Sequence, residues 1–215
     1  MSILTTIFII NAFNLIDGID GLADTTGIIV NSAFATLFIY IHQFELAGIC
    51  LSMVGALFGF LRYNITPAKI FMGDTGSMML GLVSVVMAIK FIEVNNIVGG
   101  SLPHIYAVPA LSIAILIGPI FDALRVFTLR IAKGLSPFKA DRNHVHHRML
   151  RLGFNHMQTT LILASVNIVS IALALLFSYY GNIVIIIVIA LSSMLFNWII
   201  TFLIRCKERE QFSLR

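Results

Sequence analysis

Long apolar stretches, most of them close to 20 residues and separated by polar connections, dominate this sequence. A helix needs about 20 mostly apolar residues to cross the hydrocarbon core of a bilayer. We predict six such spanning helices, preceded by a shorter apolar stretch from Met1 to about Phe13 that has the length of part of a span. The six predicted spans are 24–41, 46–61, 75–92, 104–130, 158–180 and 183–204.

The low charge content excludes several soluble classes of protein. Only 11% of the residues are charged and 59% are hydrophobic, whereas a soluble domain has about 25% charged residues. Two cysteines do not make a disulfide framework. We expect an all-α, polytopic integral membrane helical bundle in the lipid bilayer, with residues 1–215 as a single membrane-embedded domain. The net charge of +4 then reports topology, and no nucleic acid is expected as a partner.

Lysine and arginine gather on one side of this predicted topology. If the segment after Phe13 is cytoplasmic, Lys90 alone of the 14 lysines and arginines falls on the outer side. Cytoplasmic loops of membrane proteins carry this excess. The connections on the inner side, at about 14–24, 62–74 and 131–157, are also longer and more polar than the outer ones. We therefore expect any site to lie at the cytoplasmic surface of the membrane.

The first of three polar clusters follows the opening apolar stretch. Its side chains are spaced by three: Asn11, Asn14, Asp17 and Asp20. A continued helix would place them near one stripe, and the glycines beside the aspartates allow a sharp turn. Ionisable groups at membrane depth are costly and by default mark a functional site. Asp20 or Asp24 could instead cap the next helix, but a cap does not require two asparagines and two aspartates.

The second cluster, FMGDTGS at 71–77, opens the predicted span 75–92. A helix N-terminus preceded by a glycine such as Gly73 presents free N–H groups, which suit a phosphate. Asp74 could hold a divalent cation beside it. The alternative is that Asp74 caps the helix and that Phe71 anchors it at the membrane interface, and this segment alone leaves both readings open.

The third cluster is the basic, histidine-rich stretch KGLSPFKADRNHVHHR at 133–148. Three histidines in four positions could bind a transition metal, but no cysteine accompanies them and the neighbouring arginines disfavour a cation. Arginine offers bidentate contacts to an anion such as a diphosphate. A solvated positively charged loop would explain the lysines but not the histidines.

Together the three clusters fit phosphoryl transfer at the membrane surface. Mg²⁺ binds through a few carboxylates together with substrate phosphates. It would polarise a diphosphate and make the departing phosphate a better leaving group. From these residues alone, we predict phosphoryl transfer to a membrane-embedded acceptor.

The three segments closely resemble the polyprenyl-phosphate N-acetylhexosamine-1-phosphate transferase family, glycosyltransferase family 4. The matching stretches are NAFNLIDGIDGLA at 11–23, FMGDTGS at 71–77 and SPFKADRNHVHHRM at 136–149. The last stretch is similar to the branch that transfers N-acetylglucosamine-1-phosphate to undecaprenyl phosphate, and looks less like the muramoyl-pentapeptide branch.

The resemblance implies an enzyme of the bacterial cytoplasmic membrane with its active site on the cytoplasmic face. It would convert a UDP-N-acetylhexosamine and undecaprenyl phosphate into UMP and an undecaprenyl-diphospho-sugar. This is the initiating step of cell-envelope polysaccharides such as teichoic acid, capsule or the O-antigen of lipopolysaccharide. A homodimer is left open.

Motif positions carry the family's roles onto particular residues of this sequence. Asp74 would bind Mg²⁺, or Mn²⁺ in its place, and Asn14 would contact the metal or the diphosphate. Asp17 and Asp20 would be catalytic-centre or nucleotide-contacting groups, and Phe71 would stack on the uracil. The lipid phosphate would attack the β-phosphorus of the UDP-sugar directly, although a covalent aspartyl route is also open.

The basic loop would hold the diphosphate or the sugar phosphate in the same picture. The side chains expected to do so are His144, His146, His147, Arg142 and Arg148. Gly73 would contact substrate through the turn that opens its helix.

One part of the family pattern is missing from this sequence. Family members carry an Asp-Asp motif on an earlier cytoplasmic loop, and this sequence contains no Asp-Asp pair. From the resemblance we expect about four amino-terminal spans to be absent. A fragment, a misassigned start at Met1 or a truncated reading frame would each explain this, and the missing motif leaves open whether the 215-residue chain is active on its own.

Three alternatives compete with this interpretation. An intramembrane aspartyl protease of the Gly-x-Gly-Asp type would use Asp74, but Phe71 stands where that motif has glycine, and the histidines would have no role. A cation-coupled transporter predicts broken helices near the midplane and a repeat, whereas the polar groups here lie at the inner boundary. A non-catalytic remnant is separated from an enzyme by Mg²⁺ dependence and product formation.

Overall fold

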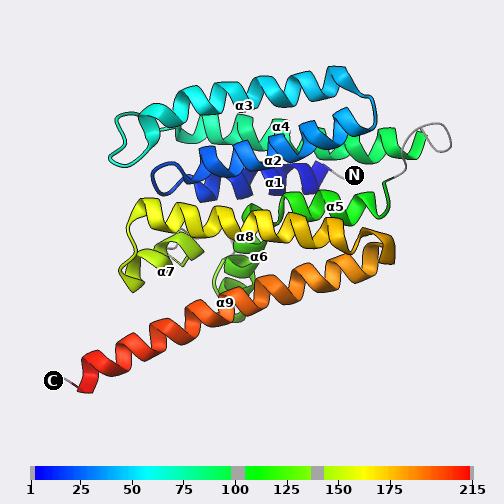
Figure 1. The fold of residues 1–215 in the computed structure, drawn as a ribbon. Coiled ribbons are helices and arrows are strands. Elements are labelled where there is room, and N and C mark those ends of the chain that lie inside the picture. The colour runs from blue at the N-terminus through cyan, green and yellow to red at the C-terminus, as the bar shows by residue number, and fades with distance from the viewer. Residues whose placement is uncertain (1–2, 98–104, 137–142, 214–215) are drawn as a thin grey trace.

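The computed structural model describes residues 3–97, 105–136 and 143–213. These residues fold into α-helices and contain no strand (Figure 1), so the predicted all-α class is confirmed. The helices in chain order are α1 (Ile3–Ile16), α2 (Leu22–Tyr40), α3 (Phe44–Asn64), α4 (Gly73–Ile97), α5 (Val108–Ile115), α6 (Ile117–Ala132), α7 (Val145–Leu152), α8 (His156–Leu176) and α9 (Asn182–Ser213). A single 3-10 turn, Ser178–Tyr180, precedes α9.

Most of these helices are long and apolar enough to cross a membrane. Five qualify individually, namely α2, α3, α4, α8 and α9, and α5 with α6 makes a sixth if the bent pair is one span. The first helix, α1, is apolar but has only 14 residues. The prediction of about six spans after a partial one is therefore confirmed, and the chain is a multi-pass membrane protein.

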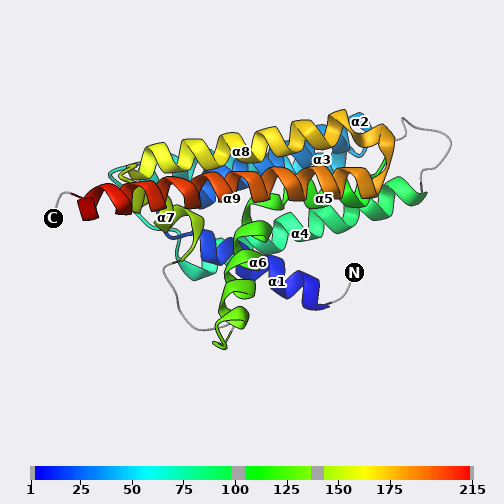
Figure 2. The same cartoon turned by 90° about the horizontal axis from the view of Figure 1, so that it is seen from below.

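The predicted span 104–130 is not one straight helix. Its described part is divided at Leu116 into α5 and α6, which are bent by 77° relative to each other. Pro119 has no N–H to donate to the Ile115 carbonyl and its ring would clash with that carbonyl, so a straight helix cannot continue through this position. Figure 2 shows α6 leaving the direction that the other long helices share.

A short helix lies inside the connection that we predicted as a loop over 131–157. This helix, α7, has eight residues, and its Val145 and Met149 are buried against Ile200 of α9. This helix has only two turns and carries four basic or imidazole side chains. The sequence therefore showed no long apolar pattern at this place. Contact with α9 supplies the apolar environment that α7 needs.

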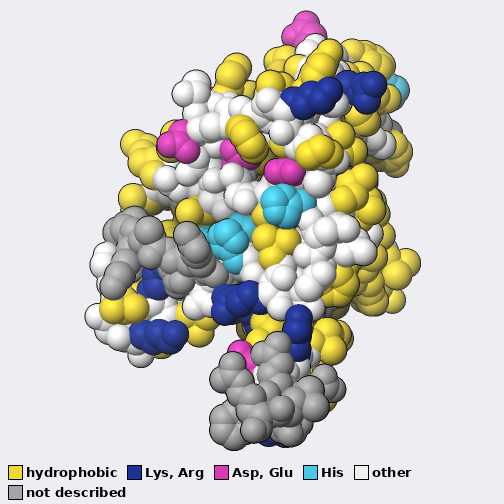
Figure 3. Space-filling view, turned by 90° about the vertical axis from the view of Figure 1, so that its left-hand side faces the viewer, with side chains coloured by type: hydrophobic (Ala, Val, Ile, Leu, Met, Phe, Trp, Pro, Cys, Tyr) yellow, Lys and Arg dark blue, Asp and Glu magenta, His cyan; other side chains and the backbone are white. Residues whose placement is uncertain are grey.

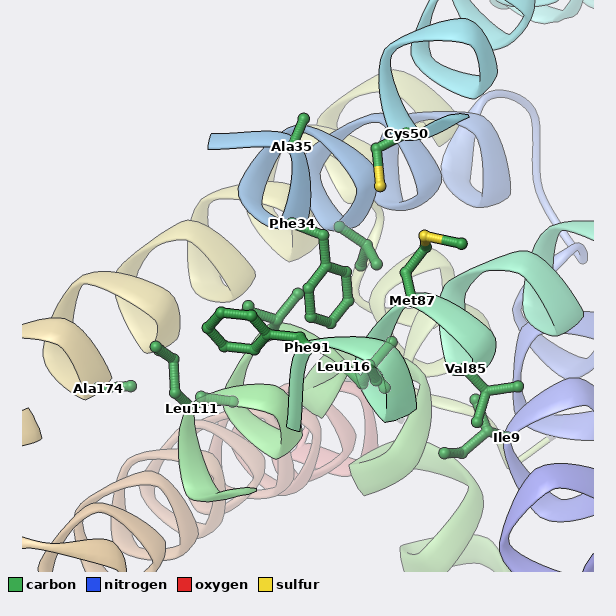
Figure 4. Close-up of a cluster of buried hydrophobic side chains, with 14 of the residues drawn as sticks. Ile9, Phe34, Ala35, Cys50, Val85, Met87, Phe91, Leu111, Leu116 and Ala174 are labelled. Carbon is green, nitrogen blue, oxygen red and sulfur yellow. The ribbon is translucent and has the colours of Figure 1, made fainter. Parts of the chain in front are cut away.

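The largest apolar core joins the first five helices with parts of α8 and α9, and Figure 4 shows part of it. Phe91 of α4 meets Phe34 and Phe38 of α2 edge to face, with ring centroids 6.1 and 5.8 Å apart. Edge-to-face pairs contribute about 0.5–1.5 kcal/mol beyond the area that they bury. These contacts lie in the halves of α2 and α4 that are distant from the polar clusters.

All three polar clusters reach the same end of the bundle, on the left in Figure 1. We call this the polar end and define it by the turn 17–21, the segment 65–72 and α7. The chain returns to this end because α1 and α3 finish there while α2, α4 and α8 begin there. The predicted topology grouped the clusters in the same way.

Candidate functional site

Asn14 connects the first polar cluster to the second. Its Nδ2 donates to Oδ1 of Asp74 at 2.9 Å and to Oγ of Ser77 at 3.0 Å. The Ser77 hydroxyl donates in turn to the carbonyl of Gly73 at 3.0 Å. The last turn of α1 is thereby fixed against the first turn of α4, as the motifs predicted, and Ser77 is a buried member that we did not single out.

The start of α4 is open to ligands. Gly73 has φ 67° and faces no heavy atom within 4 Å of where a Cβ would stand, so this turn is both left-handed and uncrowded. Asp74 is exposed, and the Phe71 ring before it is 76% exposed. A helix start leaves N–H groups without partners inside the helix, so a phosphate and a planar ring can both be accommodated here.

Asp17 lies in the turn after α1, near Asp74. Burial raises the pKa of Asp17 to about 6; the negative charge of Asp74 adds to the rise, and a backbone hydrogen bond from Gly73 opposes it. A carboxylate that lies beside a second acidic side chain is stabilised by a cation nearby.

The oxygen ligands at this place fit Mg²⁺. No group of three or more His, Cys, Asp or Glu side chains within the described residues is arranged to hold a metal. Mg²⁺ does not need such a cage, because it is usually bound by one or two carboxylates with water and substrate phosphates completing the shell. Asp74, Asp17 and the Asn14 carbonyl match that need.

Asp20 makes different contacts from those of Asp17. Its Oδ2 accepts a hydrogen bond from the Ala68 amide at 3.3 Å, and its Oδ1 lies 3.3 Å from Nδ1 of His156 without hydrogen-bond alignment. The Asp20 carbonyl accepts from the Thr160 hydroxyl at 3.2 Å. Asp20 therefore ties the turn 17–21 to the segment before α4 and to α8.

Capping does not explain the aspartates around the start of α2. The N-cap of α2 is Gly21, and no side chain caps it. Asp24 is 1% exposed, and neither of its carboxylate oxygens has a hydrogen-bond partner. Neither Asp20 nor Asp24 is therefore the N-cap of α2.

Asp122 of α6 organises the third cluster, although we did not include it among the predicted site residues. Its Oδ2 lies 2.9 Å from Nδ1 of His144, and its Oδ1 accepts from the Val145 amide at 2.9 Å. A carboxylate on Nδ1 fixes the ring's orientation and leaves Nε2 for another partner. A charged residue inside an apolar predicted span was the signal available in the sequence.

His146 packs against the turn of the first cluster. A Cβ on Gly18 would stand 2.5 Å from His146 Nε2, so only glycine allows this approach. His146 is 2% exposed, and burial, followed by the neighbouring charge of His147, lowers the pKa of His146 to about 4. Its ring stacks at 5.8 Å on that of His144 and lies 4.3 Å from that of His147. The structure thus joins the histidines to Asp17 and its turn.

Arg148, which we predicted to bind the diphosphate, makes its described hydrogen bonds to α9. Nη1 donates to Oδ1 of Asn197 and Nη2 to Oγ1 of Thr201, both at 2.6 Å. Burial, with the charges of Arg125 and Arg151, lowers the pKa of Arg148 to about 10, so it stays a cation at neutral pH. Arg142 lies outside the described residues.

Histidine, acidic and basic side chains gather on the face of the polar end. Figure 3 shows histidines near the middle of this face, acidic side chains next to them on one side, and lysine or arginine both on the opposite side and beyond the acidic side chains. Carboxylates suit a divalent cation and basic side chains suit phosphates. A metal-bound diphosphate would match this combination.

A pocket opens beside the histidine cluster, between α6, α8 and α9. Its empty volume is about 640 Å³, including open solvent. Most of its lining is apolar, and Asp122, His146 and Asn167 contribute polar groups. Because this volume includes open solvent, it describes an open recess, and the lining residues are what bear on a ligand.

Comparison with known proteins gives a family match over the first part of the chain. Residues 1–92 match the model of "Glycosyl transferase family 4". This range includes the first two clusters and ends before the third.

Curated relatives are similar over about three quarters of the chain. A decaprenyl-phosphate N-acetylglucosaminephosphotransferase of Mycolicibacterium smegmatis is 32% identical over 174 residues, which cover 76% of this chain and 43% of that protein. A probable undecaprenyl-phosphate N-acetylglucosaminyl 1-phosphate transferase of Bacillus subtilis is 34% identical over 167 residues, with the same coverage. A phospho-N-acetylmuramoyl-pentapeptide-transferase of Clostridium acetobutylicum is 35% identical over 168 residues, 77% of this chain and 48% of that protein.

Two facts follow from these similarities. The chain spans less than half the length of these curated relatives. Identity does not separate the N-acetylglucosamine branch, at 32 and 34%, from the muramoyl-pentapeptide branch, at 35%, so the branch assignment rests on the loop motif.

Proposed function

The chain belongs to glycosyl transferase family 4, and from this premise we propose that it transfers an N-acetylhexosamine-1-phosphate from a UDP-sugar to undecaprenyl phosphate. The enzymes of this family are phosphosugar transferases, which removes the grounds for a protease or a transporter. The observation that carries the proposal is the meeting of the three motifs at one end of the bundle, through Asn14 with Asp74 and Gly18 with His146.

The donor sugar nucleotide would lie across the polar end. The exposed ring of Phe71 suits stacking on a uracil. The diphosphate would extend toward His144, His146 and His147, with the basic side chains nearby neutralising its charge. Lysine and arginine side chains on the side of the histidines away from the acidic groups support that direction (Figure 3).

Mg²⁺ is the proposed cofactor, held by Asp74, Asn14 and Asp17. When bound, it would neutralise the diphosphate and improve UMP as a leaving group. Asp17 and Asp74 would also orient the part of the substrate that binds the ion, because Asp74 accepts a hydrogen bond from Asn14 of α1 and Asp17 accepts one from the Gly73 backbone at the start of α4.

The reaction itself would need little covalent chemistry from the protein. An oxygen of the lipid phosphate attacks the β-phosphorus, the bond from that phosphorus to the bridging oxygen breaks, and UMP leaves with the electron pair. Positioning and charge neutralisation supply most of the acceleration in such transfers. Asp122 contributes by holding His144 through Nδ1, so that the opposite ring nitrogen can meet a phosphate oxygen.

The acceptor would approach from the membrane. The apolar helices give it a lipid environment, and the mostly apolar pocket beside His146 suits part of an isoprenoid chain. We further propose that the polar end faces the cytoplasm at the bacterial inner membrane, and that the product starts a cell-envelope polysaccharide. The names of the relatives support a polyprenyl phosphate as acceptor.

An assay of UMP release tests this function. The chain is incubated with UDP-N-acetylglucosamine, undecaprenyl phosphate and Mg²⁺, beside its Asp74→Asn variant and the matched control Thr36→Val, whose hydroxyl bonds only within its own helix. We expect UMP from the chain and the control, and little or none from Asp74→Asn or with a chelator. The Bacillus subtilis relative serves as the positive control, and if it alone releases UMP with several UDP-sugars, the proposed activity of this chain is wrong.

A further inference from the structure

We propose that α9 positions the histidine cluster, with Asn197 and Thr201 as positioning residues that act through Arg148. The histidine cluster is His144, His146 and His147. This inference rests on the proposed function, in which that cluster binds the diphosphate. In this arrangement, the side of α9 that faces α7 fixes how the histidines lie against the turn 17–21.

The first support is the fork of hydrogen bonds from Arg148. Its two terminal nitrogens each reach a different acceptor on α9, Asn197 and Thr201, at 2.6 Å. A guanidinium presents its donors in a rigid plane, so two acceptors one helical turn apart fix both its place and its orientation. Arg148 is 5% exposed, and a buried cation without acceptors would be strongly destabilising.

The second support lies at the other end of α7. Lys207 of α9 donates from Nζ to the carbonyls of Arg151 at 3.1 Å and Leu152 at 2.9 Å. The last carbonyls of a helix have no partners within that helix, and a cation there also complements the helix dipole. Lys207 therefore caps α7 from outside.

The third support is an apolar contact between these two polar ones. Val145 and Met149 pack on Ile200, with Ile204 partly buried against them. Asn197, Ile200, Thr201, Ile204 and Lys207 follow one another at intervals of one to three residues and lie on one stripe of α9. The whole stripe faces α7.

The helix that carries the histidines depends on this stripe. α7 has eight residues, and isolated helices shorter than about 12–15 residues are marginal in water. On the side of the turn 17–21, His146 lies against Gly18, where a single Cβ would already clash. α7 is therefore held between α9 and that turn, and a shift on α9 changes the fit at His146.

Helix α9 is long enough both to cross the membrane and to contact α7. With 32 residues it is about 48 Å long, whereas the hydrocarbon core is about 30 Å thick. The part that contacts α7 begins at Asn197, about 22 Å along the helix, and continues past the end of a core of this thickness. The same helix can thus cross the bilayer and provide a docking surface that begins within the last part of the span and extends beyond it.

Histidine modification tests the proposal without any need for catalysis. The full chain in detergent is treated with diethyl pyrocarbonate, which modifies neutral accessible imidazoles, and the labelling of His144, His146 and His147 is compared by mass spectrometry with that of His42. His42 is exposed on the far end of the bundle and serves as an internal reference. The variants are Asn197→Leu and Thr201→Val, and the matched control is Thr36→Val, whose hydroxyl is exposed.

We expect Asn197→Leu to raise labelling of the cluster relative to His42 by about tenfold, as the loss of one hydrogen bond to a charged group predicts. Asn197→Asp keeps an acceptor for Arg148 and should restore the low labelling. Thr201→Val keeps the side-chain shape, so it provides the test if Asn197→Leu fails to fold. Unchanged labelling in folded Thr201→Val and Asn197→Leu overturns the proposal.

The UMP assay separates this proposal from the proposed function. If UMP is released, we expect Asn197→Leu to raise the KM for the UDP-sugar by about tenfold with a smaller effect on kcat, and Asn197→Asp to reverse the change. A chain that shows the labelling change but releases no UMP supports the positioning role and contradicts the proposed function. A chain that releases UMP without the labelling change contradicts only the positioning role.

Discussion

Gly18 is the residue at which the first and third motifs touch. Its missing side chain leaves room for the ring of His146, whose Nε2 would lie 2.5 Å from an added Cβ. Because the neighbouring element, α7, is held from behind by α9, the ring cannot withdraw without breaking other contacts. Substitution at this position should therefore cost stability as well as activity.

We expect Gly18→Ala to destabilise the chain by about 1–3 kcal/mol, the usual cost of an extra methyl group in a packed site. Gly55→Ala in α3 is the matched control, because a Cβ there meets no atom within 4 Å and alanine favours a helix by about 1 kcal/mol. Thermal unfolding in detergent measures both. Equal melting temperatures for the two variants would contradict the contact between Gly18 and His146.

Because the imidazole of His146 is buried, we predict that the stability of the folded chain depends on pH. Burial lowers its pKa in the folded chain to about 4 from an ordinary value of 6.5, so the unfolded chain binds the proton more tightly between these values. This contribution to stability is complete above pH 6.5 and is lost as the pH falls toward 4. The full change is on the order of 3 kcal/mol.

The measurement is the melting temperature in detergent at pH 7.5 and at pH 5, for the chain and for His146→Asn. We expect the chain to lose more stability than the variant, because asparagine cannot take up a proton. The same pH dependence in both would show that other groups control it.

At the scale of elements, the joint between α6 and α7 decides where the histidines lie. The bend at Pro119 turns α6 by 77° from α5, and this brings Asp122 to the start of α7. The Asp122 carboxylate then forms hydrogen bonds with two groups at once, the ring of His144 and the amide of Val145.

We expect Asp122→Asn to lower UMP release by about 10-fold or more, because asparagine cannot accept both bonds and hydrogen bonds to charged groups contribute about 1.5–3 kcal/mol. Glu93→Gln is the matched control, since Glu93 is exposed near the other end and, among the residues that the structure describes, forms its ion pair with Lys90 of its own helix. Circular dichroism checks that both variants keep their helices. Full activity of Asp122→Asn would exclude a positioning role for Asp122.

At the scale of the whole molecule, the proposed orientation predicts which end meets which compartment. Arg209 belongs to the part of α9 beyond the polar end, and Glu45 begins α3 at the opposite end. In a background that replaces Cys206 with serine, Glu45→Cys should react with a membrane-impermeant maleimide in intact cells with a permeable outer envelope. Arg209→Cys should react only after the inner membrane is opened. The reverse pattern would show that the polar end faces outward.

The grouping of the polar motifs at one end of the bundle was predicted from the positions of the polar connections between the spans. Asn14, Asp74 and Gly73 come together as expected, since a helix end and a helix start on the same side of a bundle bring short motifs into reach. Arg148 was expected at the diphosphate, but the structure shows it bonded to Asn197 and Thr201. These partners lie 49 and 53 residues away and belong to no recognisable motif, so nothing in the sequence marked them.

The sequence by itself determined the membrane class, the approximate spans and the side on which the polar groups gather. These follow from apolar length, from the position of lysine and arginine, and from motif spacing, all of which are local properties of the chain. Only the tertiary structure decided the bend at Pro119, the helix within the third loop and the contacts of Asp122, Gly18 and α9 with the histidines. Such contacts depend on how distant helices pack, and packing is set by the shapes of both partners together.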